Sequence, residues 1–201
     1  MDRFSFFFAF YGLILGLAVA ELLGGFAGMV RAHALKKLEA QTALTAILTF
    51  VLIVATWVDT YTMDRSITLN FADLWPPIML ATFYYLAAAV IFPRERQQFS
   101  HMRLYFAARR KFIIGMLFAA EIVDFYSNRA FLTDRYYRNP AAFWDWNVPY
   151  NIVIKGVFLA LFLVRGRRAT IALLVAQILI FMVPYWQWGA IDRIAMRLFG
   201  H

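Results

Sequence analysis

Residues 4–30 read FSFFFAFYGLILGLAVAELLGGFAGMV and contain one charged side chain, Glu21. At 1.5 Å of rise per residue, a helix over this segment is about 40 Å long, more than the roughly 30 Å hydrocarbon core of a bilayer. An apolar run of this length is typical of a membrane-spanning helix. The segment therefore predicts an integral membrane protein.

The rest of the chain has the same character. Hydrophobic residues make up 63% of its 201 residues and charged residues only 16%, whereas soluble chains are about a quarter charged. The apolar residues fall into blocks separated by short charged stretches. We predict an all-α fold, a six-transmembrane-helix bundle with short loops that forms one integral membrane domain over residues 1–201. The expected spans are 4–30, 42–63, 71–92, 112–131, 148–164 and 170–190.

The third expected span contains Pro76 and Pro77 near its start, where the first turn of a helix tolerates proline. Two flanking segments, residues 97–111 (QQFSHMRLYFAARRK) and the C-terminal residues 191–198, alternate apolar and basic side chains at helical spacing. We interpret both as amphipathic interfacial helices on the membrane surface, with arginines reaching the headgroups. A docking surface for a partner is the alternative.

Several functional classes are disfavoured by composition. The chain has no cysteine, which excludes disulfides, thiolate nucleophiles and cysteine-ligated metals. Its three histidines, His33, His101 and His201, lie outside the expected spans, so neither a haem nor a histidine-ligated zinc site is expected. No HExxH, GxSxG or glycine-rich phosphate loop occurs. We therefore expect no metal, no cofactor and no enzyme activity; a lipid-modifying enzyme is the least supported class.

The formal net charge of +8 lies mainly in loops, which favours contact with anionic lipids over nucleic acid. Loops expected on one side carry most of the Lys and Arg: Arg31, Lys36, Lys37, Arg94, Arg96, Arg103, Arg109, Arg110, Lys111, Arg165, Arg167 and Arg168. The positive-inside rule places that side in the cytoplasm and both termini outside. All six tryptophans fall on the other side: Trp57, Trp75, Trp144, Trp146, Trp186 and Trp188. Compact loops without cysteine favour a bacterial inner membrane.

Charged side chains within spans are costly unless they are paired or hydrated, so each is a functional candidate. Glu21, Glu121 and Lys155 each lie ten residues from the nearest basic loop residue, which places them about 15 Å deep. Gln177 lies within about one helical turn of the same level. Lys155 is too deep to reach the interface, so we expect it to pair with Glu21 and Glu121. The surplus carboxyl is expected to hold or exchange a proton.

This midplane layer predicts a small transporter or channel that moves a cation, a proton or a small polar solute. The expected pathway residues are Glu21, Asp59, Glu121, Asp124, Asn128, Asn151, Lys155 and Gln177. Those nearer the outside, including Asp59, Asp124 and Asn128, would line an outward approach. A static polar clamp that fixes the register of the helices is the alternative interpretation.

A ladder of small residues runs along the first span: Gly12, Gly16, Ala20, Gly24 and Gly28. Small residues four apart let two helix backbones approach closely in a membrane. The ladder is either an internal packing seam or the interface with a second copy or a membrane partner. The second reading leads to the other functional hypothesis, a non-catalytic structural or accessory subunit of a larger membrane complex.

Overall fold

The structure, a computed structural model, describes residues 3–62, 71–127, 140–142, 144–145 and 148–182. All regular elements within these ranges are helical, which confirms the all-α prediction. In chain order they are α1 (Arg3–Arg31), η1 (Leu35–Lys37), α2 (Ala40–Thr62), α3 (Phe71–Ile91), η2 (Arg96–His101), α4 (Met102–Ser127), α6 (Pro140–Ala142) and α7 (Val148–Leu163). A further helix covers residues 167–182.

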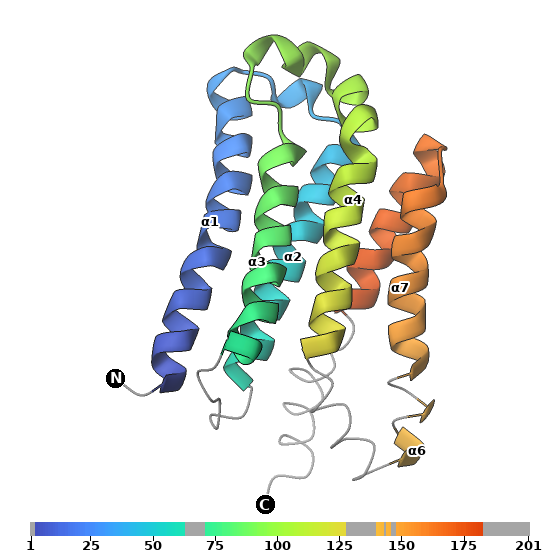
Figure 1. Cartoon of the computed structure of the whole chain (residues 1–201). Helices are drawn as coiled ribbons and strands as arrows, with labels where there is room; N and C mark the ends of the chain where they lie inside the picture. The colour runs from blue at the N-terminus through green and yellow to red at the C-terminus, as the bar shows by residue number, and fades with distance from the viewer. Residues whose placement is uncertain (1–2, 63–70, 128–139, 143, 146–147, 183–201) are drawn as a thin grey trace, which may run out of the picture.

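Three helices are long and apolar enough to cross a membrane. Their qualifying segments are Ser5–Arg31 in α1, Ala40–Thr60 in α2 and Leu74–Ile91 in α3. α7 is apolar but has only 16 residues, and the apolar half of α4 carries Glu121 and Asp124. The chain is therefore consistent with a membrane-embedded protein that has at least these three candidate spans. α4, α7 and the helix of residues 167–182 run lengthwise beside them (Figure 1).

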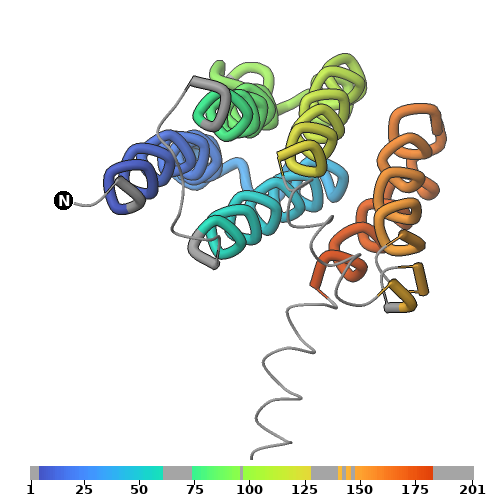
Figure 2. The backbone as a smooth tube through the Cα atoms, turned by 60° about the horizontal axis from the view of Figure 1, so that its bottom comes forward, coloured from blue at the N-terminus to red at the C-terminus, as the bar shows by residue number. Residues whose placement is uncertain are grey.

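α3 lies at the centre of the packing. It packs against α1 on one side and α4 on the other, while α2 packs against α1, α3 and α4. α7 packs against α4, and the helix of residues 167–182 is tied to α7 by the Tyr150 hydroxyl, which donates to the carbonyl of Ile180 at 3.3 Å. α1 and α7 consequently lie at opposite edges of the bundle (Figures 1 and 2).

α1 ends in a backbone motif that turns the chain toward η1. His33 adopts a left-handed conformation with φ of 52°, its N–H donates to the carbonyl of Val30 and the N–H of Ala34 donates to the carbonyl of Met29. These two bonds satisfy helix-terminal carbonyls in the pattern of a Schellman cap. Glycine usually occupies that position, so His33 adopts it at a local steric cost.

The prediction of an interfacial helix over residues 97–111 is wrong for most of this segment. After η2 the chain continues from Met102 directly into α4, ten residues before the predicted span. Met102 and Phe106 are buried, and the Tyr105 hydroxyl donates to the carbonyls of Val90 (3.0 Å) and Phe92 (3.2 Å). The apolar face that the sequence assigned to lipid packs on protein instead. The C-terminal segment, residues 191–198, lies outside the described residues.

The two prolines of α3 are also placed differently from the prediction. α3 begins at Phe71, so Pro76 and Pro77 lie inside the helix, beyond its first turn. Each lacks the N–H that would bond to the carbonyl four residues earlier. The helix continues through both to Ile91.

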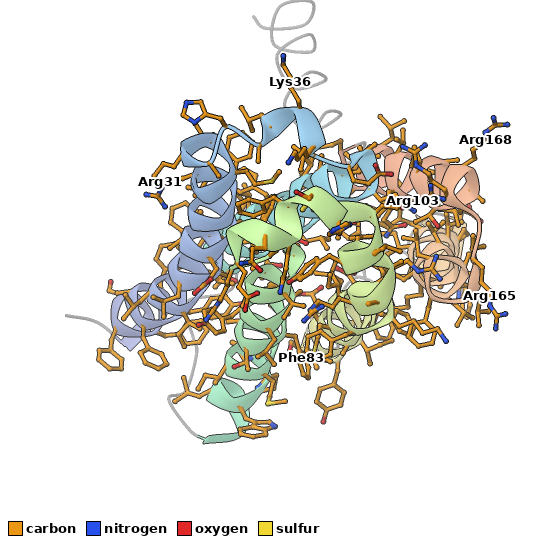
Figure 3. All side chains as sticks on the ribbon, turned by 90° about the horizontal axis from the view of Figure 1, so that it is seen from above. Arg31, Lys36, Phe83, Arg103, Arg165 and Arg168 are labelled. Carbon is orange, nitrogen blue, oxygen red and sulfur yellow. The ribbon has the colours of Figure 1, made fainter. Side chains whose placement is uncertain are left out.

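The connections after α1, α3 and α7 meet at one end of the bundle, which we call the basic end (Figure 1). Figure 3 looks onto this end, and its labelled side chains of Arg31, Lys36, Arg165 and Arg168 point outward around the periphery. Lys37 donates to the hydroxyl of Ser100 at 3.1 Å, and Arg167 donates to Glu39 at 2.6 Å. The three basic loops grouped in the sequence thus share one end of the fold.

The described tryptophans belong to the opposite end. Trp57 lies near the end of α2, Trp75 near the start of α3 and Trp144 just after α6, and all three are exposed. Indole rings favour the membrane–water interface. Trp146, Trp186 and Trp188 lie outside the described residues.

Candidate functional site

Four charged side chains from three helices form what we call the acidic cluster: Asp59 on α2, Glu121 and Asp124 on α4, and Lys155 on α7. Glu121 is at its centre, because it lies within electrostatic range of the other three. Its side chain is buried, with 8% of the residue exposed. A carboxyl group buried among other charges, in the apolar half of a helix, is a candidate site for proton or cation binding.

Lys155 is held on the face of α7 that faces α4. Its ammonium donates to Asn151 Oδ1 at 2.8 Å and lies 4.4 Å from the centre of the Phe125 ring. It is also within electrostatic range of Glu121 and Asp124. The sequence predicted that Lys155 pairs with Glu21 and Glu121. In the structure its direct partner is Asn151, and Glu121 and Asp124 of α4 lie within electrostatic range.

Glu21 is not part of this cluster, contrary to the prediction. Its carboxylate lies 3.8 Å from the guanidinium of Arg94, and a third of its side chain is exposed. α1 extends past the end of α3, since Gly25 lies against Phe92, the residue that follows α3. Glu21 therefore lies nearer the basic end of the bundle than counting from Arg31 predicts. The count also ignored that α1 and α7 lie at opposite edges of the bundle.

A small cavity adjoins the acidic cluster on the side away from the basic end. Its volume is about 20 Å³, enough for one water molecule. α1, α2, α3 and α4 all contribute to its wall, which includes Tyr11, Thr56, Asp59, Thr60, Pro77 and Asp124. The cavity thus brings two of the predicted pathway carboxylates, those of Asp59 and Asp124, to the wall of one small space.

Three tyrosines near the cluster were missed by the sequence analysis. Tyr84, 1% exposed, is hydrogen-bonded to Thr56 at 3.2 Å and lies within electrostatic range of Glu121. Tyr11 lines the cavity, and Tyr150 lies within electrostatic range of Glu121 and Asp59. A buried tyrosine usually finds a hydrogen-bond partner for its hydroxyl. That requirement, applied to tyrosines inside the predicted spans, is the signal that could have found them.

The threonines of α2 mostly bond within their own helix. The hydroxyls of Thr45, Thr49 and Thr60 donate to the carbonyls four residues earlier, at 2.7–2.8 Å. Such bonds satisfy a threonine in an apolar helix without any external partner. Their alignment on one face is therefore weak support for a pathway, whereas Thr56 bonds to Tyr84 on α3.

Gln177 lies on the helix of residues 167–182, is 0% exposed and has no hydrogen-bond partner for either amide atom within the described structure. Thr170, two helical turns nearer the basic end, accepts a hydrogen bond from Arg110 at 3.1 Å. The remaining predicted pathway residue, Asn128, lies outside the described residues.

Most residues of the small-residue ladder of α1 do not pack against another helix within the described structure. Nothing described lies within 4 Å of a side-chain carbon built on Gly16, Gly24 or Gly28, and Ala20 is exposed. Gly12 is approached only by the indole nitrogen of Trp57, at 3.3 Å. The close approach occurs instead at Gly25, where an added carbon would lie 2.6 Å from the Phe92 ring.

In the ranges that the structure describes, no group of three or more His, Asp or Glu side chains is arranged to hold a metal ion. The chemistry that the arrangement allows is exchange of protons between carboxylates, with tyrosine and threonine hydroxyls beside them. No family model, curated protein or solved structure matches the chain.

Proposed function

We propose that the protein is a small membrane transporter or channel that translocates protons through the acidic cluster, with Glu121 as the group that takes up and releases the proton. The observation that carries the proposal is the burial of Glu121 within electrostatic range of Asp59, Asp124 and Lys155. Ionisable groups inside membrane helices mark proton and ion pathways. Nothing in this arrangement requires catalysis of a covalent step.

Charge and size favour a proton over other solutes. Three carboxyl groups face one ammonium group, so the cluster favours a positive species over an anion. The adjoining cavity of about 20 Å³ has room for one water molecule and not for a hydrated metal ion or a polar metabolite. Proton exchange through water is the transfer that a space of this size permits.

The proposal includes a six-span arrangement in which α4, α7 and the helix of residues 167–182 also cross the bilayer, with the basic end in the cytoplasm and both termini outside. The grouping of the basic loops at one end supports this orientation. Because the chain has no cysteine, single cysteines at Lys36 and Trp144 give a clean test. In bacterial cells an impermeant maleimide should label the second site and spare the first; the reverse labelling pattern would refute the orientation.

Reconstitution into liposomes tests the activity. The purified protein is inserted into vesicles that contain a pH-sensitive dye, and valinomycin with a potassium gradient sets an inside-negative potential. We expect the vesicle interior to acidify faster than that of protein-free vesicles. If the vesicle interior acidifies at the same rate as in protein-free vesicles at every potential, the proposed function is wrong.

A second candidate function rests on a separate observation, the uncovered ladder of α1. α1 lies at an edge of the bundle (Figure 2). Gly16 and Gly24 are exposed, with nothing described within 4 Å. Small residues on an exposed membrane helix permit close packing against an identical helix related by twofold symmetry. This favours an accessory or structural subunit that assembles through α1, with a second copy as the partner.

Replacement of both glycines tests the assembly. Gly16→Leu with Gly24→Leu should convert a cross-linkable dimer into a monomer in mild detergent. Gly156→Leu on α7, which also has nothing described within 4 Å, is the matched control and should leave the dimer intact. A wild-type protein that is monomeric at all concentrations would eliminate this candidate.

A further inference from the structure

The buried amide of Gln177 is the polar group that the fold leaves least satisfied. The residue is 0% exposed, and neither Oε1 nor Nε2 has a hydrogen-bond partner within the described structure. A buried amide without partners is costly in an apolar surrounding, and internal water commonly supplies the missing bonds. The amide therefore points to a water site.

The direction in which Gln177 faces follows from its helix. Thr170, Leu174 and Gln177 are all 0% exposed and occupy positions i, i+4 and i+7, which share one helical face. Thr170 on this face accepts the hydrogen bond from Arg110 of α4. The buried face of the helix of residues 167–182 is therefore turned toward α4.

Glu121 lies on the same face of α4 as Arg110, the residue that bonds to Thr170. At 100° per residue, Arg110 and Glu121 differ by only about 20° around the helix, so they lie on one face. Both helices run away from the basic end (Figure 1). From the Arg110–Thr170 contact, Gln177 lies about 10 Å along its helix and Glu121 about 16 Å along α4. Gln177 thus lies on the same seam, roughly one turn closer to the basic end than Glu121.

We propose that Gln177 binds a water molecule in the seam between α4 and the helix of residues 167–182, and that this water receives or supplies the proton of Glu121 on the side of the basic end. The small cavity at Asp59 and Asp124 serves the opposite side. The Arg110–Thr170 hydrogen bond lies between this water site and the basic end. The inference rests on the proposed function for its role in transport, but the water site itself does not.

Gln177→Leu tests the role in transport. Leucine has a similar size and needs no hydrogen bond, so we expect unchanged or higher thermal stability together with a fivefold to tenfold slower proton flux, about the effect of one lost hydrogen bond. Thr42→Val is the matched control, because the Thr42 hydroxyl is the other fully buried side-chain group without a partner in the described structure. It should change neither flux nor folding. An unchanged flux in a stable Gln177→Leu protein overturns the transport role.

An experimental density map separates the two claims. A water molecule within hydrogen-bonding distance of the Gln177 amide supports the site even if liposomes show no proton flux, in which case only the proposed function fails. An amide surrounded by apolar atoms alone overturns the site whatever the flux.

Discussion

Glu121→Gln abolishes proton uptake into liposomes, whereas Glu21→Gln leaves the uptake at the wild-type rate: this is the largest difference between matched variants that the structure predicts. Both substitutions replace a glutamate in a long helix by its neutral isostere. Glu121 is buried within range of three charged groups, while Glu21 is partly exposed beside Arg94. Glutamine cannot take up or release a proton, so the step assigned to Glu121 is lost.

The expected loss is about 100-fold or more, the range for removal of a positioned proton-transfer group. Glutamine fits the space of glutamate and removes the need to bury a charge, so the variant should fold, which thermal unfolding in detergent checks. Glu121→Asp retains a carboxyl group and should keep a measurable fraction of the flux. A well-folded Glu121→Gln protein with wild-type flux would contradict the proposed role of Glu121. The acidic cluster would then be a static clamp that fixes the register of the helices.

Most of the long helices could be predicted from the sequence. Expected spans at 4–30, 42–63 and 71–92 match α1, α2 and α3 within two residues at each end. Runs of apolar residues bounded by charged loops determine such elements directly, because the hydrocarbon core dictates their length. The start of α4 could not be read in the same way, since an amphipathic pattern looks identical whether its apolar face meets lipid or α3.

The site was only partly predictable, and Glu21 shows why. Counting residues from a loop measures position along one helix. It gives neither the distance by which that helix projects beyond its neighbours nor its lateral place in the bundle. Glu121 and Lys155 also lie ten residues from the nearest basic loop residue. They do lie within electrostatic range of each other, because α4 and α7 pack against each other. The neighbours of a helix depend on pairwise packing that hydropathy does not encode.

The tyrosines beside the acidic cluster could not be predicted, for a related reason. Tyr84 and Tyr11 read as apolar members of their spans, yet both lie buried beside carboxylates. Only the packing shows which tyrosines face inward. The glycine ladder illustrates the converse: its spacing indicated a close contact, and the contact occurs at Gly25, beside the ladder.

Lys155→Met should lower the free energy of unfolding, and a second substitution at Glu121 should recover part of the loss. Methionine fills a similar volume but leaves three carboxyl groups without their cation. Breaking a buried charge pair costs about 3–5 kcal/mol. Because Lys155 is only half-buried and bonded to Asn151, we expect about 2 kcal/mol, seen as a lower midpoint of thermal unfolding. Lys36→Met, at an exposed position in η1, is the control and should have little effect.

In the double variant Glu121→Gln with Lys155→Met, one carboxylate and the lysine disappear together, so the remaining charge imbalance is smaller. We expect the double variant to be more stable than the sum of the single effects by about 1–2 kcal/mol, the coupling of residues that share one network. Its proton flux should stay at the background rate, because the carboxyl group that carries the proton is still missing. Additive effects on stability would show that Lys155 and Glu121 do not interact. Recovery of flux along with stability would show that the cluster serves only to hold the helices together.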